Sequence, residues 1–492
     1  MNPTHSPGSS LATPGGDANR KEASLLPNRR EFIKTTGRVA AASVLAGVVL
    51  PYVHAAGNDR IQLALIGCGG RGSGAVVNAL SVKNVPIKLV AMADVFQHRL
   101  NDSHVALTKE CGDKIDVPAG RRFVGFDAYQ QAMDCLQPGD IAILTTPLAF
   151  RWVHFRQAIK QRLNVFMEKP LTADGPTSRR MLKLAEEASA LNLKVGVGLM
   201  CRHSRALQQL AQRLHDGQIG DIILLRGYRM QNPIGSCFSE KWPGTPGELL
   251  WQLSRFHSFI WASGGLYNDF YIHHLDRLCW MKNAWPVKCQ TIGGRHYRQS
   301  TGGKLFVDQN FDSYAAEYTF ADGTKMLMDG RCVAGCSDFY STSAHGSKGM
   351  AVVTATADDG PCSIHTGQDP QPGNAVWTSP VNRAESNAYD NEWTDLVEAI
   401  RKDQPYNEVV RGVQASLVSS MGRLSAHTGR EVTYQEMLDH PDEYAPDADK
   451  YNLDTPPPPS FRAGRHLSPA HAGDHHPPRI RDELTQRYEP IQ

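Results

Sequence analysis

The sequence predicts an α/β protein with an N-terminal Rossmann domain, a doubly wound parallel sheet, followed by a C-terminal α/β domain with an open, mostly antiparallel sheet. Three observations support this prediction. A glycine-rich turn joins a buried strand to a helix between residues 61 and 80, and strands and helices then alternate up to residue 199. From residue 222 onward, strand-like segments follow one another with few helices between them. At 492 residues the chain is also longer than one core usually organises.

The first strand and its turn have the pattern of a dinucleotide-binding unit. Residues 61–66 (IQLALI) are almost entirely apolar, as in a strand buried on both faces, and G-x-G-x-x-G follows directly. Gly67 permits the tight turn, Gly69 lets a pyrophosphate approach bare backbone, and Gly72 lets the next helix pack closely. The predicted cofactor-binding residues of this turn are Gly67, Gly69, Gly70, Arg71 and Gly72.

A second strand ends in the acid expected to hold a ribose. Residues 87–93 are apolar except for Lys88, and Asp94 follows them about 20 residues after the last glycine of the turn. Asp94 favours NAD, because a carboxylate there would repel the 2′-phosphate of NADP. His98 and Arg99 lie near enough in sequence to leave NADP open.

Two further strands place polar residues at the same edge of the predicted sheet. Residues 140–145 (DIAILT) form one strand, and residues 164–167 form another that runs directly into Glu-Lys-Pro. The carboxyl ends of the strands in a doubly wound sheet are where ligands bind. Thr146, Pro147, Glu168 and Lys169 are therefore predicted to line the cofactor site.

A stretch in the second half combines acids and imidazoles at helical spacing. If the chain is helical from about Tyr267, then Asp269, His273 and Asp276 share one face, while His274 is rotated away. This arrangement suits a proton relay with His273 as general base and Asp269 as its partner. Two alternatives remain open, a structural hydrogen-bonded helix cap and a metal site formed by both histidines and an acid.

The first 56 residues have the order of features of a twin-arginine signal peptide. A Ser-, Gly- and Pro-rich start is followed by Arg29-Arg30 with Phe32 two residues later, then by an apolar run over residues 39–53 and small residues up to Ala56. The alternatives are an amphipathic N-terminal helix and an uncleaved anchor. Export of a folded protein predicts a periplasmic or cell-envelope location, and a nucleotide carried there should be tightly bound and recycled in place.

Composition excludes other classes. Net charge is +2 and no long basic run is present, so nucleic acid is not an expected partner. The ten cysteines show no paired spacing of a disulfide framework or metal site, and no metal is expected. The predicted divisions are residues 1–56 (signal), 57–200 (Rossmann), 201–435 (substrate and oligomerisation) and 436–492 (Pro-rich extension, an arm that wraps a neighbour or stays loose).

Taken together, the glycine turn, the acid after the second strand, Glu168-Lys169-Pro170 and the Gly-Gly-x-x-x-Asp-x-x-x-His-x-x-Asp run resemble the Gfo/Idh/MocA family of nicotinamide-dependent sugar and polyol oxidoreductases. The resemblance implies that Lys169 hydrogen-bonds the reacting hydroxyl, with Asp269 and His273 completing the site, and that the second sheet serves a homodimer or tetramer. Tyr271 departs from the usual glycine, which would add bulk or a hydroxyl near His273. Arg202 is a further candidate for substrate contact.

The leading functional hypothesis is hydride transfer between a tightly bound NAD, with NADP left open, and a hydroxyl or carbonyl of a sugar or polyol. Two alternatives remain. One is a glycoside-cleaving enzyme in which NAD transiently oxidises a sugar hydroxyl, and the other is a non-catalytic sugar-binding relative. The twin-arginine export machinery is the expected protein partner.

Overall fold

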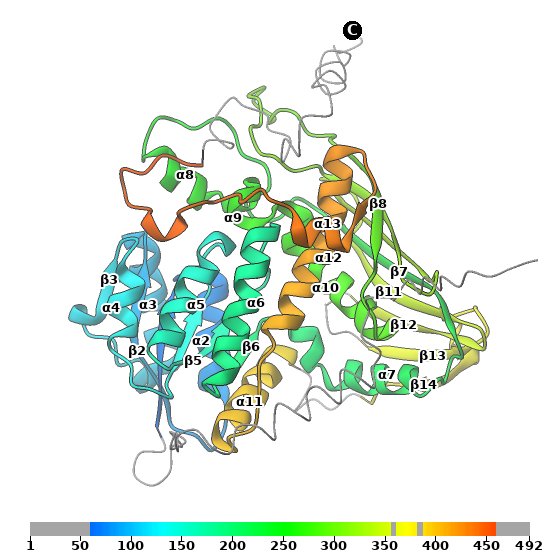
Figure 1. Cartoon of the computed structure of the whole chain (residues 1–492), viewed down its shortest axis with the longest axis horizontal. Coiled ribbons are helices and arrows are strands. Elements are labelled where there is room, and N and C mark those ends of the chain that lie inside the picture. The colour runs from blue at the N-terminus through cyan, green and yellow to red at the C-terminus, as the bar shows by residue number, and fades with distance from the viewer. Residues whose placement is uncertain (1–59, 356–360, 381–386, 459–492) are drawn as a thin grey trace, which may run out of the picture. The chain divides into compact units, whose positions relative to one another are not determined.

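The computed structural model describes residues 60–355, 361–380 and 387–458 (Figure 1). The predicted signal segment and residues 459–492 of the predicted extension lie outside these ranges. Over the described ranges, helices are either too short or too polar to span a bilayer. The same residues contain no group of three or more His, Cys, Asp or Glu side chains placed to hold a metal ion.

The first sheet is parallel and has six strands in the order β3-β2-β1-β4-β5-β6. Its strands are β1 (Ile61–Ile66), β2 (Ile87–Asp94), β3 (Arg122–Val124), β4 (Ile141–Leu144), β5 (Asn164–Met167) and β6 (Val195–Val197). The helices between them are α2 (Gly70–Ser81), α3 (Gln97–Cys111), α4 (Ala128–Met133), α5 (Arg151–Lys160) and α6 (Gly175–Ala190). Strand order reverses between β1 and β4, which places the glycine turn at the switch point of the sheet.

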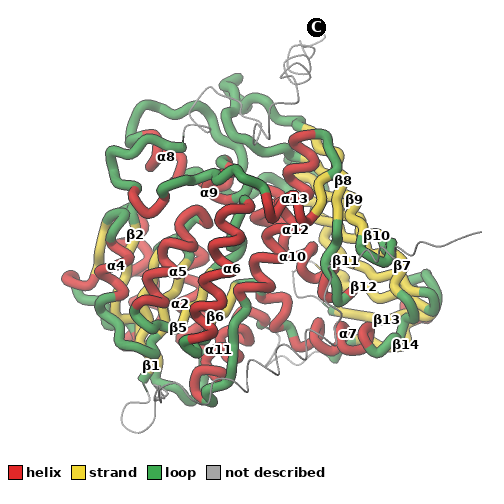
Figure 2. The backbone as a smooth tube through the Cα atoms, in the orientation of Figure 1, coloured by secondary structure: helices red, strands yellow, loops and turns green. Residues whose placement is uncertain are grey.

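The second sheet has nine strands in the order β14-β13-β12-β11-β7-β10-β9-β8-β15 (Figure 2). Its strands are β7 (Ile222–Gln231), β8 (Lys288–Gly294), β9 (Ser313–Thr319), β10 (Lys325–Cys332), β11 (Phe339–Gly346), β12 (Gly349–Ala355), β13 (Cys362–Thr366), β14 (Ala375–Thr378) and β15 (Val432–Thr433). Only the β7–β10 pair is parallel among the described strands of this sheet, and the other neighbours are antiparallel. The predicted fold class is confirmed.

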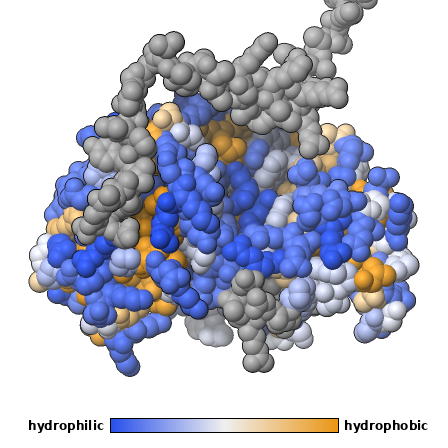
Figure 3. All heavy atoms as spheres, turned by 90° about the horizontal axis from the view of Figure 1, so that it is seen from below, coloured by the Kyte–Doolittle hydropathy of each residue, from blue (hydrophilic) through white to orange (hydrophobic). Residues whose placement is uncertain are grey.

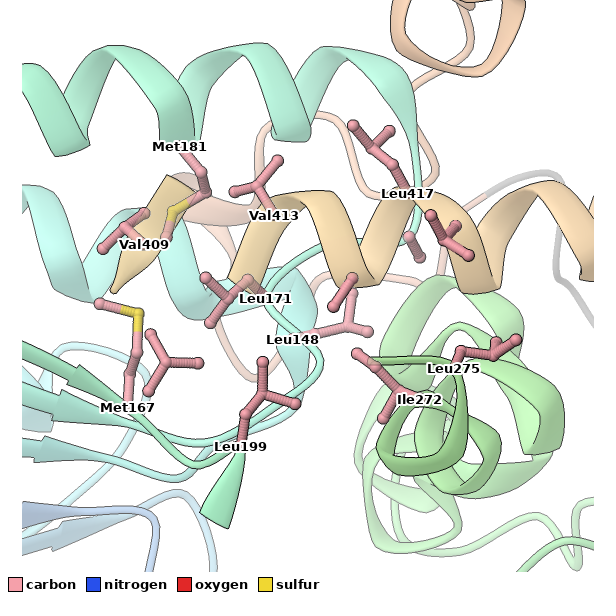
Figure 4. Packing of buried hydrophobic residues seen from close by; sticks show 14 of the residues in the cluster. Leu148, Met167, Leu171, Met181, Leu199, Ile272, Leu275, Val409, Val413 and Leu417 are labelled. Carbon is pink, nitrogen blue, oxygen red and sulfur yellow. The ribbon is translucent and has the colours of Figure 1, made fainter. Parts of the chain in front are cut away.

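The remaining helices connect the two sheets. They are α7 (Arg205–His215), α8 (Glu248–Ser254), α9 (Ile260–Ser263), α10 (Gly265–Lys282), α11 (Ala388–Arg401), α12 (Val409–Thr428) and α13 (Tyr434–Asp439). α12 packs against α6, β6 and α10, and its residues Val413 and Leu417 belong to the buried cluster shown in Figure 4. Met181, Leu171 and Val413 belong to one continuous buried cluster, so both sheets share a core.

Helix α11 completes the first sheet although it follows the second in sequence. Trp393 stacks on Phe166 of β5, with ring centroids 4.5 Å apart. Leu396 and Val397 join the cluster formed by one face of β1 and β4 with α2 and α3. A helix within the predicted second domain therefore covers the first sheet.

Residues 440–458, which follow α13, do not extend away from the molecule. Residues 440–458 cross α5 and α6 of the same chain (Figure 1). Glu443 binds Arg180 at 2.8 Å, and the Tyr444 amide donates to Asp174 at 3.0 Å. Tyr451 packs against Phe150 and Trp261. The described part of the predicted extension is thus an intramolecular strap, and the expectation of a loose or neighbour-wrapping arm is wrong for these residues.

Candidate active site

The glycine turn has the geometry that its spacing predicts. Gly67 has φ +98°, and a Cβ there would lie 2.8 Å from the Thr146 amide nitrogen. A Cβ on Gly72 would lie 2.1 Å from the Gly67 carbonyl oxygen, so α2 packs directly on the turn. At Gly69 and Gly70 nothing lies within 4 Å of such an atom, which leaves this backbone open to a ligand.

The start of α2 is free to receive an anion. Gly69 is its N-cap and supplies no side-chain hydrogen bond to the first-turn amides. These amides and the open backbone fit the pyrophosphate of a dinucleotide. The turn is stabilised from beneath by Thr145, whose hydroxyl donates to the Gly67 carbonyl at 2.6 Å.

Asp94 lies at the end of β2, where the ribose acid is predicted. Its carboxylate accepts hydrogen bonds from the Cys68 amide at 2.6 Å and the Phe96 amide at 2.8 Å. Burial raises the pKa of Asp94, although both amide bonds and the nearby Arg99 oppose that shift. Asp94 therefore organises the turn from the position where the sequence predicts the ribose acid.

Arg71 and Glu168, both predicted to bind cofactor, contact each other. Arg71 Nε lies 2.8 Å from Glu168 Oε1, and the ring of Tyr389 covers the guanidinium at 4.7 Å. Glu168 is 5% exposed, and its second oxygen accepts from the Lys169 amide at 3.2 Å. This pair joins the glycine turn to the end of β5 and to α11.

Thr146 and Pro147 follow β4 at the same edge. The Thr146 hydroxyl lies 3.2 Å from Nδ1 of His154, and its carbonyl accepts from Arg151 at 2.8 Å. Pro147 leads into a 3₁₀ turn that starts the next helical segment. Burial, followed by repulsion from Arg151, lowers the pKa of His154 to about 3, so that imidazole is neutral.

Lys169 and Asp269 meet across the two halves of the molecule. Lys169 Nζ donates to the Asp269 carbonyl oxygen at 2.7 Å and lies 3.3 Å from its Oδ1. His257 Nε2 lies 3.4 Å from the other carboxylate oxygen. Burial opposes ionisation of Asp269, but Lys169 and His257 outweigh it and hold the pKa of Asp269 below its usual range. The centre is an ionised carboxylate between an ammonium and an imidazole.

The predicted stripe on α10 divides between two environments. His273 follows Asp269 by one turn on the same helical face and is 6% exposed. Asp276 instead forms a two-point ion pair with Arg202, at 2.7 Å and 2.8 Å. Arg202 also stacks on Trp280, so both of these contacts attach the arginine to α10.

Tyr271 does not lie beside His273 as expected. Its ring packs on Gly330 of β10, where a Cβ would be 2.3 Å away, and contacts Tyr267 and Tyr314. Two residues along a helix is a rotation of about 200°, which turns this side chain from the Asp269 face to the sheet. The structure thus turns Tyr271 toward the second sheet and pairs Arg202 with Asp276, and the substrate roles expected of both residues stay predictions.

His257 and Phe270 are the neighbours of the centre that the sequence analysis missed. Phe270 lies against three cationic or imidazole groups, with centroid distances of 5.4 Å to His257, 5.7 Å to Arg229 and 5.8 Å to Lys169. His257 lies in a 3₁₀ segment without a recognisable motif. Phe270 follows Asp269 directly in sequence, and this adjacency was the only feature of the sequence that could have indicated its place near the site.

Comparisons with known proteins agree with this architecture. No protein-family model matches the chain. Inositol 2-dehydrogenase from Corynebacterium glutamicum is 22% identical over 149 residues. The matched stretch covers 30% of this chain and 44% of that relative, so the chain matches less than half the length of the curated relative.

Solved structures match over more of the chain. A myo-inositol 2-dehydrogenase from Lactobacillus plantarum aligns over 76% of this chain and 99% of its own, with 21% identity and a TM-score of 0.55. A levoglucosan dehydrogenase in complex with NADH and levoglucosan aligns over the same shares, with 17% identity and a TM-score of 0.57. An oxidoreductase domain protein from Kribbella flavida reaches a TM-score of 0.61 at 16% identity, again over 76% and 99%. These similarities establish the two-domain fold.

Proposed function

We propose that this protein is a nicotinamide-dependent oxidoreductase that transfers hydride between NAD and a CH–OH group of a sugar or polyol. The observation that carries the proposal is the contact of Lys169 with Asp269, which joins the end of β5 to α10 at the edge where the glycine turn lies. The proposal is further supported by relatives and structural neighbours that are named inositol and levoglucosan dehydrogenases.

The bound nicotinamide would supply the hydride acceptor, and the chain's own groups would handle the hydroxyl. Lys169 donates hydrogen bonds, so its ammonium would stabilise the oxygen as negative charge develops there. Asp269 pairs with the Lys169 side chain and fixes its direction. His273 would receive the hydroxyl proton, with His257 as the imidazole already in contact with Asp269.

The glycine turn and Asp94 would hold the dinucleotide, and Asp94 supports NAD as the form used. The test is to denature purified protein and identify the released nucleotide by mass, then to assay a panel of inositols and anhydrosugars by the absorbance of reduced nicotinamide. We expect NAD or NADH to be released and at least one polyol to be oxidised. Absence of both nucleotide binding and turnover would overturn the proposal.

We also propose that the chain is exported by the twin-arginine route and works in the periplasm or cell envelope. The support is Arg29-Arg30 and the segment that follows. Export would require a tightly bound cofactor that is recycled on the enzyme. Replacing both arginines by lysine should leave the protein in the cytoplasm, as fractionation would show, whereas unchanged export would exclude this route.

A homo-oligomer is part of the same proposal. Ile223, Ile292 and Phe339 lie on β7, β8 and β11 and are 60%, 79% and 51% exposed, which supports an interface on the second sheet. Figure 3 shows that hydrophilic residues occupy much of the described surface in that view. Light scattering should give the mass of a dimer or tetramer, and a monomer mass would exclude this interface.

A further inference from the structure

A buried acid on α11 has no role in the site described above. Glu392 is 2% exposed, and within the described ranges neither of its carboxyl oxygens has a hydrogen-bond partner. An unpartnered buried carboxyl is costly, because its desolvation is not compensated. Such a group in a folded protein calls for an explanation.

The neighbours of Glu392 on the helix show where it lies. Tyr389, three residues earlier, covers the Arg71 guanidinium, and Trp393, the next residue, stacks on Phe166 of β5. These two contacts place the Glu392 turn of α11 between the glycine turn and the end of β5. Among the charged groups nearby, the Glu168 carboxylate has the largest effect on the pKa of Glu392. The acid is therefore beside the residue that precedes Lys169.

The other charged groups around Glu392 already have partners. From α2, Arg71 binds Glu168. His203, in the 3₁₀ turn after β6, lies 2.7 Å from Asp395 and 3.2 Å from Glu408.

Two further arginines form ion pairs with the two acids that contact His203, and a third arginine interacts electrostatically with Glu168. Arg205 pairs with Asp395 and Arg411 with Glu408. The third is Arg151 of α5, which is attracted by the Glu168 carboxylate. The cations facing Glu392 are thus engaged by other acids.

Electrostatics then decides the state of this acid. Burial, followed by repulsion from Glu168, raises the pKa of Glu392 well above its usual value, and the attraction of His203 and Arg71 does not reverse this. The protonated form of Glu392 is therefore favoured beside the Glu168 carboxylate. When a buried carboxyl interacts with a second carboxyl, the number of protons that the two groups bind changes with the charge nearby.

We propose that Glu168 and Glu392 form a proton-binding pair that carries one more proton when the bound nicotinamide is reduced than when it is oxidised. The inference rests on the proposed function, in which the nicotinamide lies near Lys169. The oxidised ring carries a positive charge and the reduced ring does not, so reduction favours protonation of a neighbouring carboxyl pair.

The pair would keep the reaction balanced on the enzyme. Oxidation of CH–OH breaks a C–H bond, whose electron pair leaves with hydride, and an O–H bond, whose proton is received by His273 and then held on the pair. When a second, carbonyl substrate takes the hydride, the proton returns with it to form a new CH–OH group. A proton held in this way suits a cofactor that is reduced and reoxidised without leaving the protein.

The test measures nucleotide binding rather than turnover. Purified protein is equilibrated with a fixed mixture of NAD and NADH over a pH series from about 5 to about 9, and the bound nucleotides are extracted and quantified. Because the reduced form binds the extra proton, the bound NADH:NAD ratio should rise as pH falls. The rise should approach about tenfold per pH unit between the pair's pKa values in the two states, and vanish outside that window.

Matched variants assign the proton to this pair. Glu392→Gln should make the ratio independent of pH, whereas Glu392→Asp keeps a carboxyl and should keep the dependence. Glu398→Gln is the control, since Glu398 lies on the same helix but is exposed and paired with Lys402.

Two results would overturn the proposed proton-binding pair. One is a bound NADH:NAD ratio that does not change with pH in the unmodified protein, and the other is an unchanged pH dependence of this ratio in Glu392→Gln. The first is decisive even if Glu392→Gln does not fold. Failure to bind either nucleotide would instead overturn the proposed function, and the pair with it.

Discussion

At the scale of single residues, the ion pair of Lys169 and Asp269 carries the proposed chemistry. Replacing Lys169 with Ala removes the donor to the reacting oxygen and should lower kcat/KM by about 10²- to 10⁴-fold. Nucleotide released on denaturation should be unchanged. Lys325→Ala is the control, because Lys325 forms an exposed pair with Glu317 on the second sheet. Full activity in Lys169→Ala would exclude the assigned role.

A second single-residue effect concerns pH. Burial alone would lower the pKa of His203, but hydrogen bonds to Asp395 and Glu408 outweigh it and raise the pKa to about 9 from its usual 6.5. Because the pKa of His203 is higher in the folded state, protonation of His203 stabilises the fold. This contribution to the free energy of unfolding is complete below about pH 6.5 and is lost as pH rises through about 9. Its full size is on the order of 3 kcal/mol.

Urea denaturation of the unmodified protein and of His203→Gln should therefore give free energies of unfolding that differ most near pH 6 and converge above about pH 9. A difference that is constant with pH would show that His203 is not charged in the fold.

At the scale of elements, the strap of residues 440–458 stabilises the fold in a way that its Pro- and Asp-rich composition conceals. Tyr444 is 5% exposed, and its hydroxyl accepts a hydrogen bond from Arg423 at 3.0 Å. Tyr444→Ala should lower the free energy of unfolding by about 3 to 5 kcal/mol, because a buried aromatic leaves a cavity.

Tyr444→Phe is the matched variant, since it keeps the ring and removes only the hydrogen bond, for a loss of about 1 kcal/mol. Chemical denaturation measures both losses. Equal stability of all three proteins would mean that the strap contributes nothing to folding.

At the scale of the whole molecule, the two sheets are built as one structure. Trp393 and Leu396 of α11 are buried against the first sheet, and α12 packs between that sheet and α10. A fragment of residues 57–200 would leave this apolar surface uncovered. We expect the fragment to lack a cooperative thermal transition and to bind NAD poorly, as calorimetry and nucleotide titration would show. A cooperatively folded fragment would contradict this view.

The sequence was sufficient for features that depend on local pattern. Strand periodicity predicted both sheets, and the glycine spacing predicted a turn in which Gly67 and Gly72 are sterically required. Because the carboxyl ends of parallel strands lie at one edge of a sheet, the sequence also placed Thr146, Glu168 and Lys169 at the edge that carries this turn. Helical geometry also placed Asp269 and His273 on one face, and the same geometry, applied to Tyr271, would have turned it toward the sheet.

Only the tertiary structure decided which charged groups meet. Asp276 could not be separated from Asp269 by spacing, yet one binds Arg202 and the other binds Lys169 and His257. Likewise, nothing in the pattern of α11 showed that Glu392 lies beside Glu168, far away in sequence. Periodicity reports which face of an element is buried, whereas the partner of a buried charge depends on how separate elements pack. The sequence by itself therefore determined the fold class and the edge that carries the site, and packing determined which carboxylates are ionised, paired or protonated there.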